Sequence, residues 1–246
     1  MIPASRIGAF FDIDGTLLPP PSLERRFASW LLDCGLLSNL LIVKWGMIAF
    51  SALLTGDAAA LRMNKSYLGG LPTSVFDDWE ATLPAGVLSL FPAAEEQLAF
   101  HLGRRHQVFL VSGTLDPLAR ALARRIGESI GVYATELGEI GGACSGSVEG
   151  KHLSGPAKAD AIAKIARAFG ISLAESHAYG NHLDDLEMLS SVGHPVAVNP
   201  THPLKRVAQQ RGWRTLRWTL SESANGFAAQ QQPFSQRRPD ESPWLF

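Results

Sequence analysis

The sequence predicts an α/β fold with a doubly wound, Rossmann-like parallel sheet. Short runs of apolar residues recur at residues 7–11, 108–111, 177–179 and 196–198. Runs that are apolar throughout are typical of strands buried on both faces of a parallel sheet. Each run closes on a small or polar segment, and stretches with helical periodicity lie between the runs. Strands and helices therefore alternate, as such a sheet requires.

The helices expected in this alternation carry apolar residues on one face. They cover residues 116–126, 156–169, 184–190 and 203–210. In doubly wound sheets, ligands bind beyond the carboxyl ends of the strands. The polar residues that close the apolar runs are therefore the first candidates for a functional site.

Residues 16–107 contain no further convincing core strand, although a simple crossover needs only about a dozen residues. Their content is helical, with candidate helices at residues 23–34, 37–54 and 58–68. We therefore expect a helical cap domain, inserted over the carboxyl edge of the sheet. The glycine-rich segment 136–149 is expected to form a second, smaller insertion, a β-hairpin flap.

These expectations divide the chain into three parts. Residues 1–18 and 85–220 form the α/β core, and residues 19–84 form the cap domain. Residues 221–246 are dense in Gln, Ser, Pro and Arg and show little periodicity, which predicts a flexible tail.

The composition limits the classes of function. The 22 Lys and Arg residues against 23 Asp and Glu residues give a net charge of -1, so no overall positive field attracts nucleic acid. The 46% of hydrophobic residues is enough for a sizeable core. Cys34 and Cys144 form no metal-binding pattern and fit a reducing, cytoplasmic location. We expect no nucleic-acid partner, and the composition leaves the oligomeric state open.

The apolar segment 36–54 raises the question of membrane contact. It contains Lys44, and a lysine at the centre of a spanning helix costs roughly 3 kcal/mol. Its apolar residues also follow a helical stripe, which favours a helix that packs one face on protein. A helix resting on the bilayer surface is the alternative.

The strongest local signal is residues 12–16, Asp-Ile-Asp-Gly-Thr, directly after the first apolar run. Asp12 and Asp14 would stand at the end of a buried strand, where an unpaired carboxylate is costly unless it serves a site. An ordinary turn, in which Asp14 and Gly15 reverse the chain, is the structural alternative.

Three later segments place further polar groups at the same edge. In residues 111–114, Ser112 and the amide of Gly113 suit an anion, although a helix cap would also explain them. Lys158 falls in the first turn of a helix, an unfavourable place for a cation without a nearby anion, although a solvated lysine is the alternative. Residues 180–185 bring amide and carboxylate groups, which could equally form an acidic helix start.

In this order the four segments resemble the motifs of the haloacid dehalogenase superfamily. The resemblance is strongest to its phosphoserine-phosphatase-like branch, and it extends over roughly residues 7–218. It includes the segments 134–137, 192–200 and 211–213, and the long insertion resembles the helical cap of that branch. It implies the same α/β core with an inserted cap.

The resemblance implies a phosphatase that hydrolyses phosphomonoesters through an aspartyl-phosphate intermediate. Asp12 would be the nucleophile. Asp14 would protonate the leaving alkoxide and later take a proton from water. Ser112, the amide of Gly113 and Lys158 would hold the phosphoryl oxygens. The expected partner is a small phosphorylated substrate.

The resemblance also implies Mg²⁺ as cofactor. Its ligands would be the Asp12 carboxylate, the backbone carbonyl of Asp14, and side chains of the acidic loop, Asn181 and Asp185. Asn181 stands where the family pattern has an aspartate, so one negative charge is missing. Metal affinity should fall by ~10–100-fold if the loss resembles that of a supporting ligand, unless the neighbouring Asp184 compensates.

The substrate remains open at this stage. Pro21 occupies the position at which phosphoserine phosphatases of this branch carry a glutamate that reads the substrate's amino group, which disfavours phosphoserine. The apolar segment 36–54 would suit a lipid-like ester and a peripheral membrane phosphatase. Asn181 raises a third possibility, a weakened enzyme that binds a phosphorylated ligand without efficient turnover.

Overall fold

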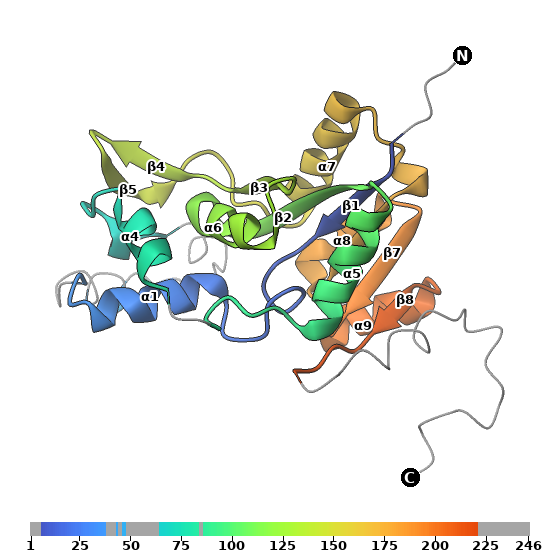
Figure 1. Cartoon of the computed structure of the whole chain (residues 1–246), viewed down its shortest axis with the longest axis horizontal. Coiled ribbons are helices and arrows are strands. Elements are labelled where there is room, and N and C mark those ends of the chain that lie inside the picture. The colour runs from blue at the N-terminus through green and yellow to red at the C-terminus, as the bar shows by residue number, and fades with distance from the viewer. Residues whose placement is uncertain (1–5, 38–42, 44–45, 48–63, 84–85, 221–246) are drawn as a thin grey trace, which may run out of the picture.

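The computed structural model describes residues 6–37, 43, 46–47, 64–83 and 86–220. Its centre is a six-stranded parallel sheet (Figure 1). The strands of this sheet, in spatial order, are β3 (Gly131–Thr135), β2 (Gln107–Leu115), β1 (Gly8–Phe11), β6 (His177–Gly180), β7 (His194–Val198) and β8 (Arg214–Leu216). This is the doubly wound α/β fold that the sequence predicts.

Helices cover both faces of the sheet. Alternate residues of β1 point to opposite faces, so Phe11 joins one hydrophobic cluster and Phe10 joins the other. The first cluster includes residues of α5 (Pro92–Gly103) and α6 (Asp116–Ile126). The second includes residues of α7 (Pro156–Phe169), α8 (Leu186–Ser190) and α9 (His202–Gln210). Burial on both faces explains why β1 is apolar throughout.

The four predicted strands are confirmed as β1, β2, β6 and β7, and the structure adds β3 and β8. The sequence analysis did not identify the two added strands because they are edge strands with few buried residues. In β3 only Thr135 is fully buried, and β8 has three residues, of which only Leu216 is buried. A continuous apolar run is absent from β8, whereas β3 contains a short one at residues 132–134 that the prediction did not use.

The insertion after β1 contains α1 (Leu23–Asp33), the short 3₁₀ helix η1 (Ser66–Leu68) and α4 (Val75–Thr82). Leu23, Phe27 and Leu31 lie on one side of α1 and are fully buried. The Phe27 ring stacks at 4.9 Å from that of Phe76 in α4, so these two helices share one core. The sequence analysis predicted α1 but not α4, whose eight residues are too short to show a clear period.

The predicted hairpin is present as β4 (Leu137–Ile140) and β5 (Ala143–Val148). It lies beside the insertion, at the left of Figure 1. Cys144 in β5 links the two: its carbonyl accepts from the Gly70 N–H at 2.9 Å, and its N–H donates to Leu71 at 2.8 Å. The hairpin and the insertion are therefore joined by backbone hydrogen bonds.

Several expectations fall on residues outside the described ranges. These are most of the helix expected at 37–54, the first part of that expected at 58–68, and the tail 221–246. Within the second of these segments, residues 66–68 form the 3₁₀ turn η1 rather than the end of an α-helix. No helix in the described part of the chain combines the length and the apolar character needed to cross a membrane.

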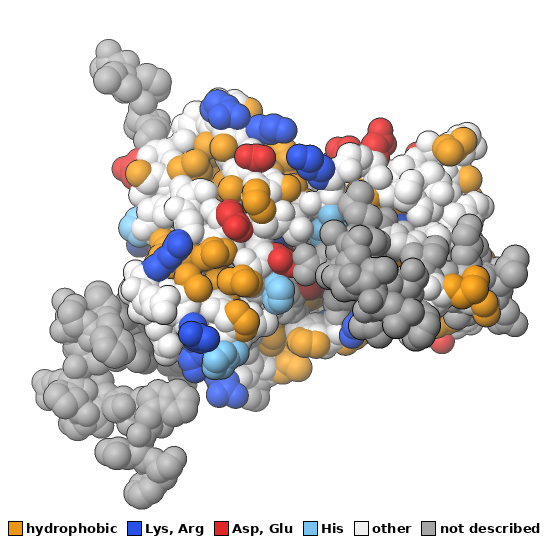
Figure 2. All heavy atoms as spheres, turned by 180° about the vertical axis from the view of Figure 1, so that it is seen from behind, with side chains coloured by type: hydrophobic (Ala, Val, Ile, Leu, Met, Phe, Trp, Pro, Cys, Tyr) orange, Lys and Arg blue, Asp and Glu red, His pale blue; other side chains and the backbone are white. Residues whose placement is uncertain are grey.

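Figure 2 shows the face opposite to that of Figure 1. Lys and Arg side chains are interspersed there with acidic and apolar side chains. The described residues therefore form no continuous basic surface on this face.

Candidate active site

The polar residues that close β1, β2 and β6 meet at the carboxyl edge of the sheet. Phe11 of β1 lies opposite Leu110 of β2 and Tyr179 of β6. Asp12 follows Phe11 directly, and its backbone N–H donates to the Tyr179 carbonyl at 2.9 Å. The Ser112 hydroxyl, from β2, donates to Asp12 Oδ1 at 3.2 Å. The parallel register of adjacent strands therefore brings these side chains together.

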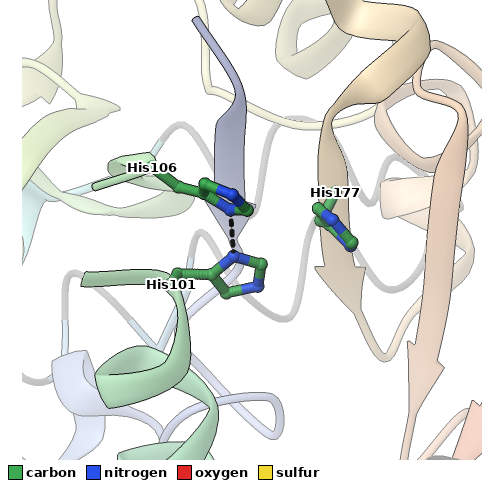
Figure 3. A group of neighbouring side chains, drawn as sticks. All are labelled: His101, His106 and His177. Atoms are coloured by element: carbon green, nitrogen blue, oxygen red, sulfur yellow. Dashed lines mark hydrogen bonds between the residues drawn. The ribbon is translucent and has the colours of Figure 1, made fainter. Parts of the chain in front are cut away.

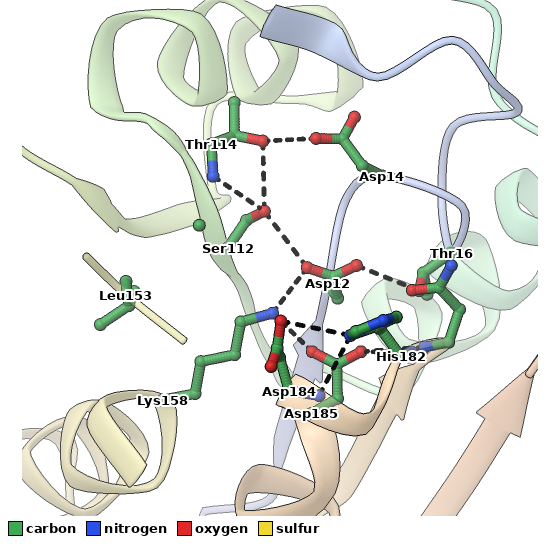
Figure 4. A network of polar contacts seen from close by, with 12 residues as sticks. Asp12, Asp14, Thr16, Ser112, Thr114, Leu153, Lys158, His182, Asp184 and Asp185 are labelled. Atoms are coloured by element: carbon green, nitrogen blue, oxygen red, sulfur yellow. Dashed lines mark hydrogen bonds and ion pairs between the residues drawn. The ribbon is translucent and has the colours of Figure 1, made fainter. Parts of the chain in front are cut away.

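Lys158 joins two of the acidic residues (Figure 4). Its Nζ lies 2.6 Å from Asp12 Oδ1 and 2.6 Å from Asp185 Oδ1, and all three side chains are buried. Burial disfavours the charge of Lys158, but the two carboxylates outweigh this effect and hold its pKa above the ordinary value. Burial raises the pKa of Asp12 to about 7, against the lowering influence of Lys158. A lysine in the first turn of a helix is expected to have an anion nearby, and for Lys158 in α7 these anions are Asp12 and Asp185.

Asp14 has a separate set of partners. Its Oδ1 accepts the backbone N–H of Leu23 at 2.7 Å, and its Oδ2 accepts the Thr114 hydroxyl at 2.7 Å. Burial raises the pKa of Asp14, although both hydrogen bonds act in the opposite direction. A raised pKa suits a carboxyl group that has to carry a proton. Leu23 begins α1, so the insertion itself helps to orient Asp14.

Asp185 and Asn181, in the acidic loop after β6, make different contacts. Both oxygens of Asp185 are already engaged: Oδ1 contacts Lys158, while Oδ2 accepts the N–H groups of Asn181 and His182, each at 3.0 Å. The Asn181 side chain packs against Gly15, where a Cβ atom would lie 2.1 Å from Asn181 Nδ2. Gly15 also has a φ of 81°, so this position suits glycine for two reasons.

These residues fit a hard divalent cation. The Asn181 amide lies against the turn that follows Asp14. Among the described residues, Thr16 alone donates a hydrogen bond to Asp12 Oδ2, at 3.3 Å. Carboxylate, carbonyl and amide oxygens from these positions form the kind of donor set that Mg²⁺ takes in proteins. Asp185 Oδ1 has one contact, with Lys158, and so keeps a lone pair for such a cation, whereas Oδ2 holds the two loop amides.

A cavity of about 280 Å³ opens above this network. Its walls include residues of the insertion, Glu24 and Lys65, as well as core residues. Lys65 Nζ lies 2.6 Å from Glu24 Oε1, and the Tyr67 hydroxyl donates to the same oxygen at 2.6 Å. On the core side, the His152 ring lies over Gly113, where a Cβ atom would come within 2.5 Å of it. The insertion therefore supplies part of the cavity wall.

The structure brings all the site residues named from the sequence to this one cavity: Asp12, Asp14, Ser112, Gly113, Lys158, Asn181 and Asp185. The sequence analysis did not identify the roles of Thr16, Thr114 and Lys65. The signal for Thr114 in the sequence is its hydroxyl group, which comes two residues after that of Ser112, and the two hydroxyl groups lie 3.3 Å apart.

His182, adjacent to the acidic loop, has a local structural role. The ring nitrogen Nδ1 of His182 accepts the backbone N–H of Asp184 at 3.3 Å, and the backbone N–H of His182 donates to Asp185 Oδ2. This reciprocal pair caps η3 (Leu183–Asp185).

Comparison with known proteins gives the family. Residues 9–190, well over half of the chain, match the model of the haloacid dehalogenase-like hydrolases. The chain belongs to this family. Among the folds similar to this haloacid dehalogenase-like hydrolase is a crystal structure of a protein of unknown function from Bordetella pertussis. The comparison of the two structures gives a TM-score of 0.74 at 24% sequence identity, and it covers 87% of this chain and 99% of the Bordetella pertussis chain.

Two curated relatives of this hydrolase come from Mycobacterium tuberculosis. Phosphoserine phosphatase SerB1 is 33% identical over 135 residues, which are 55% of this chain and 44% of the relative. A probable phosphatase is 28% identical over 225 residues, covering 87% of this chain and 76% of the relative. The match to SerB1 thus spans less than half of that protein, whereas the match to the second relative covers most of both chains.

Proposed function

We propose that this hydrolase is a Mg²⁺-dependent phosphatase that cleaves a small phosphomonoester through an aspartyl-phosphate intermediate. The observation that carries the proposal is the convergence of Asp12, Ser112 and Lys158 within hydrogen-bonding distance at one cavity. A nucleophilic carboxylate, a hydroxyl donor and an ammonium group are what phosphoryl transfer to a carboxylate needs. The phosphatase names of the two relatives support the same chemistry.

In the first step, an oxygen of the Asp12 carboxylate attacks phosphorus, and the bond from phosphorus to the ester oxygen breaks. The Asp14 carboxyl group gives its proton to the departing alkoxide, a role that suits its raised pKa. Lys158 and the Ser112 hydroxyl turn from Asp12 towards the phosphoryl oxygens and stabilise their charge.

In the second step, the Asp14 carboxylate takes a proton from a water molecule, whose oxygen attacks phosphorus. The bond from phosphorus to the Asp12 oxygen breaks, so inorganic phosphate leaves and the Asp12 carboxylate is restored. Thr114 and the Leu23 amide keep Asp14 oriented through both steps.

Asp12, the Asp14 carbonyl and Asn181 would hold Mg²⁺ directly. The bound ion would neutralise charge between the nucleophilic carboxylate and the phosphate group. Asp185 holds Lys158 and the two loop amides, and its Oδ1, which has one contact, keeps a lone pair that would serve as a further ligand.

We assign residues 19–84 to a cap that selects the substrate. Glu24 lines the cavity on this side, but Lys65 and Tyr67 already contact its carboxylate. Its charge is therefore balanced and not free to bind a substrate ammonium group. Together with Pro21 in place of the family's glutamate, this disfavours phosphoserine and favours an ester without an amino group.

The test is phosphate release from para-nitrophenyl phosphate and from a panel of phosphorylated metabolites and lipids, with and without Mg²⁺. Turnover should require Mg²⁺ and be abolished by Asp12→Asn. The matched control is Asp160→Asn, the same chemical change at an exposed position of α7. Equal activity of Asp12→Asn and the wild type would overturn the nucleophile assignment.

Asn181 favours one alternative outcome, a protein that binds a phosphorylated ligand but turns it over poorly. Calorimetry on the same panel separates the two functions. A ligand that binds in the presence of Mg²⁺ and is never hydrolysed would identify a binding protein, whereas rapid turnover of that ligand would exclude it.

A further inference from the structure

A cluster of histidines lies at the end of the sheet opposite to the active site (Figure 3). His177 is the first residue of β6, His106 directly precedes β2, and His101 lies in the last turn of α5. One ring nitrogen of each lies within 4.8 Å of the others. His101 is fully buried, while the other two rings are partly exposed and open to solvent.

The contacts of His101 fix which of its nitrogens faces the cluster. Its Nδ1 lies 2.8 Å from Nδ1 of His106, whereas its Nε2 faces away, 2.9 Å from the Tyr179 hydroxyl. Gln97 Nε2 also lies 3.3 Å from His101 Nε2, while Gln97 Oε1 is buried without a hydrogen-bond partner. With the Gln97 amide turned over, Oε1 takes the place next to His101 Nε2 and can accept an N–H from it, while the Gln97 NH₂ group takes the buried place that has no partner.

A proton on Nε2 leaves Nδ1 of His101 as a lone pair directed at His106. A histidine that ligates a metal usually donates its other N–H to an oxygen, and Tyr179 and the turned Gln97 provide such oxygens. Burial lowers the pKa of His101 to about 3 and that of His177 to about 4. Both rings are therefore neutral at pH 7, as ligation requires.

We propose that His101, His106 and His177 form a binding site for a borderline-soft divalent ion such as Zn²⁺, separate from the carboxylate site proposed for Mg²⁺. Imidazole nitrogens suit Zn²⁺, whereas Mg²⁺ prefers oxygen ligands. Tetrahedral Zn²⁺ with Zn–N bonds of about 2.0–2.1 Å needs ligand nitrogens roughly 3.3 Å apart. The 2.8 Å pair needs only a small separation, and the third nitrogen is already near.

One adjustment accompanies binding. In the metal-free pair, the His106 Nδ1 proton is shared with His101, so this proton moves through solvent to His106 Nε2, with no net proton released at neutral pH. The fourth position is left for solvent or for His194, whose ring stacks on His177 with centroids 4.7 Å apart.

The experiment is calorimetric titration of Zn²⁺ into the full wild-type chain without a phosphorylated substrate, with Mg²⁺ in millimolar excess to occupy the carboxylate site. We expect one Zn²⁺ per chain. The double substitution His106→Gln with His177→Gln should weaken binding by at least about tenfold. The control is His202→Gln, at an exposed histidine outside the cluster. Because no substrate is present, the result does not depend on catalytic activity.

Co²⁺ provides a second readout, because its visible absorption reports nitrogen ligation in a four-coordinate site. The absorption should develop in the parent protein and be lost in the double variant, and circular dichroism checks that both are folded. Absence of Zn²⁺ binding, or equal binding by parent and double variant, would overturn the proposal and leave the histidines as a hydrogen-bonded structural cluster.

Discussion

Lys158 Nζ lies 2.6 Å from Asp185 Oδ1, and this contact is as short as the one it makes with Asp12. One buried ammonium group thus lies between two buried carboxylates and offsets one of their two negative charges. Phosphoryl transfer requires Lys158 to leave Asp12 for the substrate, and Asp185 gives it a fixed position from which to do so.

Removing this ammonium group should destabilise the fold. Lys158→Met leaves Asp12 and Asp185 buried without their common counter-ion, and we expect a loss of about 3–5 kcal/mol in the free energy of unfolding. Urea denaturation at pH 8 without Mg²⁺ measures it. Lys164→Met, at an exposed position of the same helix, should change stability by less than about 0.5 kcal/mol. Equal stabilities of the two variants would contradict the role of the ion cluster.

Replacing Thr114 should shift the pH dependence of turnover. The Thr114 hydroxyl donates to ionised Asp14 and so lowers its pKa. Thr114→Val removes this donor at nearly constant volume, so the pKa of Asp14 should rise. Because the first step needs Asp14 protonated, the alkaline limb of the pH–kcat profile should move upward by up to about one pH unit. Thr215→Val, on the exposed edge strand β8, should leave the profile in place.

Asn181→Asp should raise the affinity for Mg²⁺, because it adds a negative ligand. The Mg²⁺ concentration at half-maximal activity should fall clearly, while the rate at saturation should change by less than about tenfold, or ~1.4 kcal/mol. An anionic ligand also reduces the pull of the cation on the phosphoryl oxygens, so tighter binding need not accelerate the reaction. An unchanged Mg²⁺ requirement would remove Asn181 from the ligand set, and Asp184 would become the next candidate.

The histidine cluster should make the fold sensitive to acid. Burial lowers the pKa of His101 to about 3 and that of His177 to about 4, both below the ordinary 6.5. Between pH 6.5 and these lowered pKa values, the unfolded chain binds protons at His101 and His177 that the folded chain does not. The stability that these two histidines contribute should therefore fall as the pH drops below about 6.5 and be lost near pH 3. Urea denaturation in EDTA measures the slope. His101→Gln should reduce it, and an unchanged slope would show that His101 titrates normally.

The sequence was sufficient for the core strands because burial on both faces makes them continuously apolar. It was also sufficient to predict that the polar residues after these strands lie together, since the carboxyl ends of parallel strands meet at one edge of the sheet. It could not give the contact of Lys158 with Asp185, which depends on how α7 packs beside the loop after β6. The histidine cluster was missed for the same reason, because His101 and His177 come from elements far apart in the chain.

The backbone hydrogen bonds of Cys144 have a consequence for access to the cavity. The insertion leaves and re-enters the core at one narrow stem, where the Phe91 N–H donates to Leu17 at 3.0 Å. The hairpin leaves and re-enters the core at a second narrow stem, where the Glu149 N–H donates to the Glu136 carbonyl at 2.9 Å. Because the backbone hydrogen bonds of Cys144, together with that from the Thr73 N–H to Gly142, tie the two insertions to each other, they can separate at this side of the cavity only after these hydrogen bonds break.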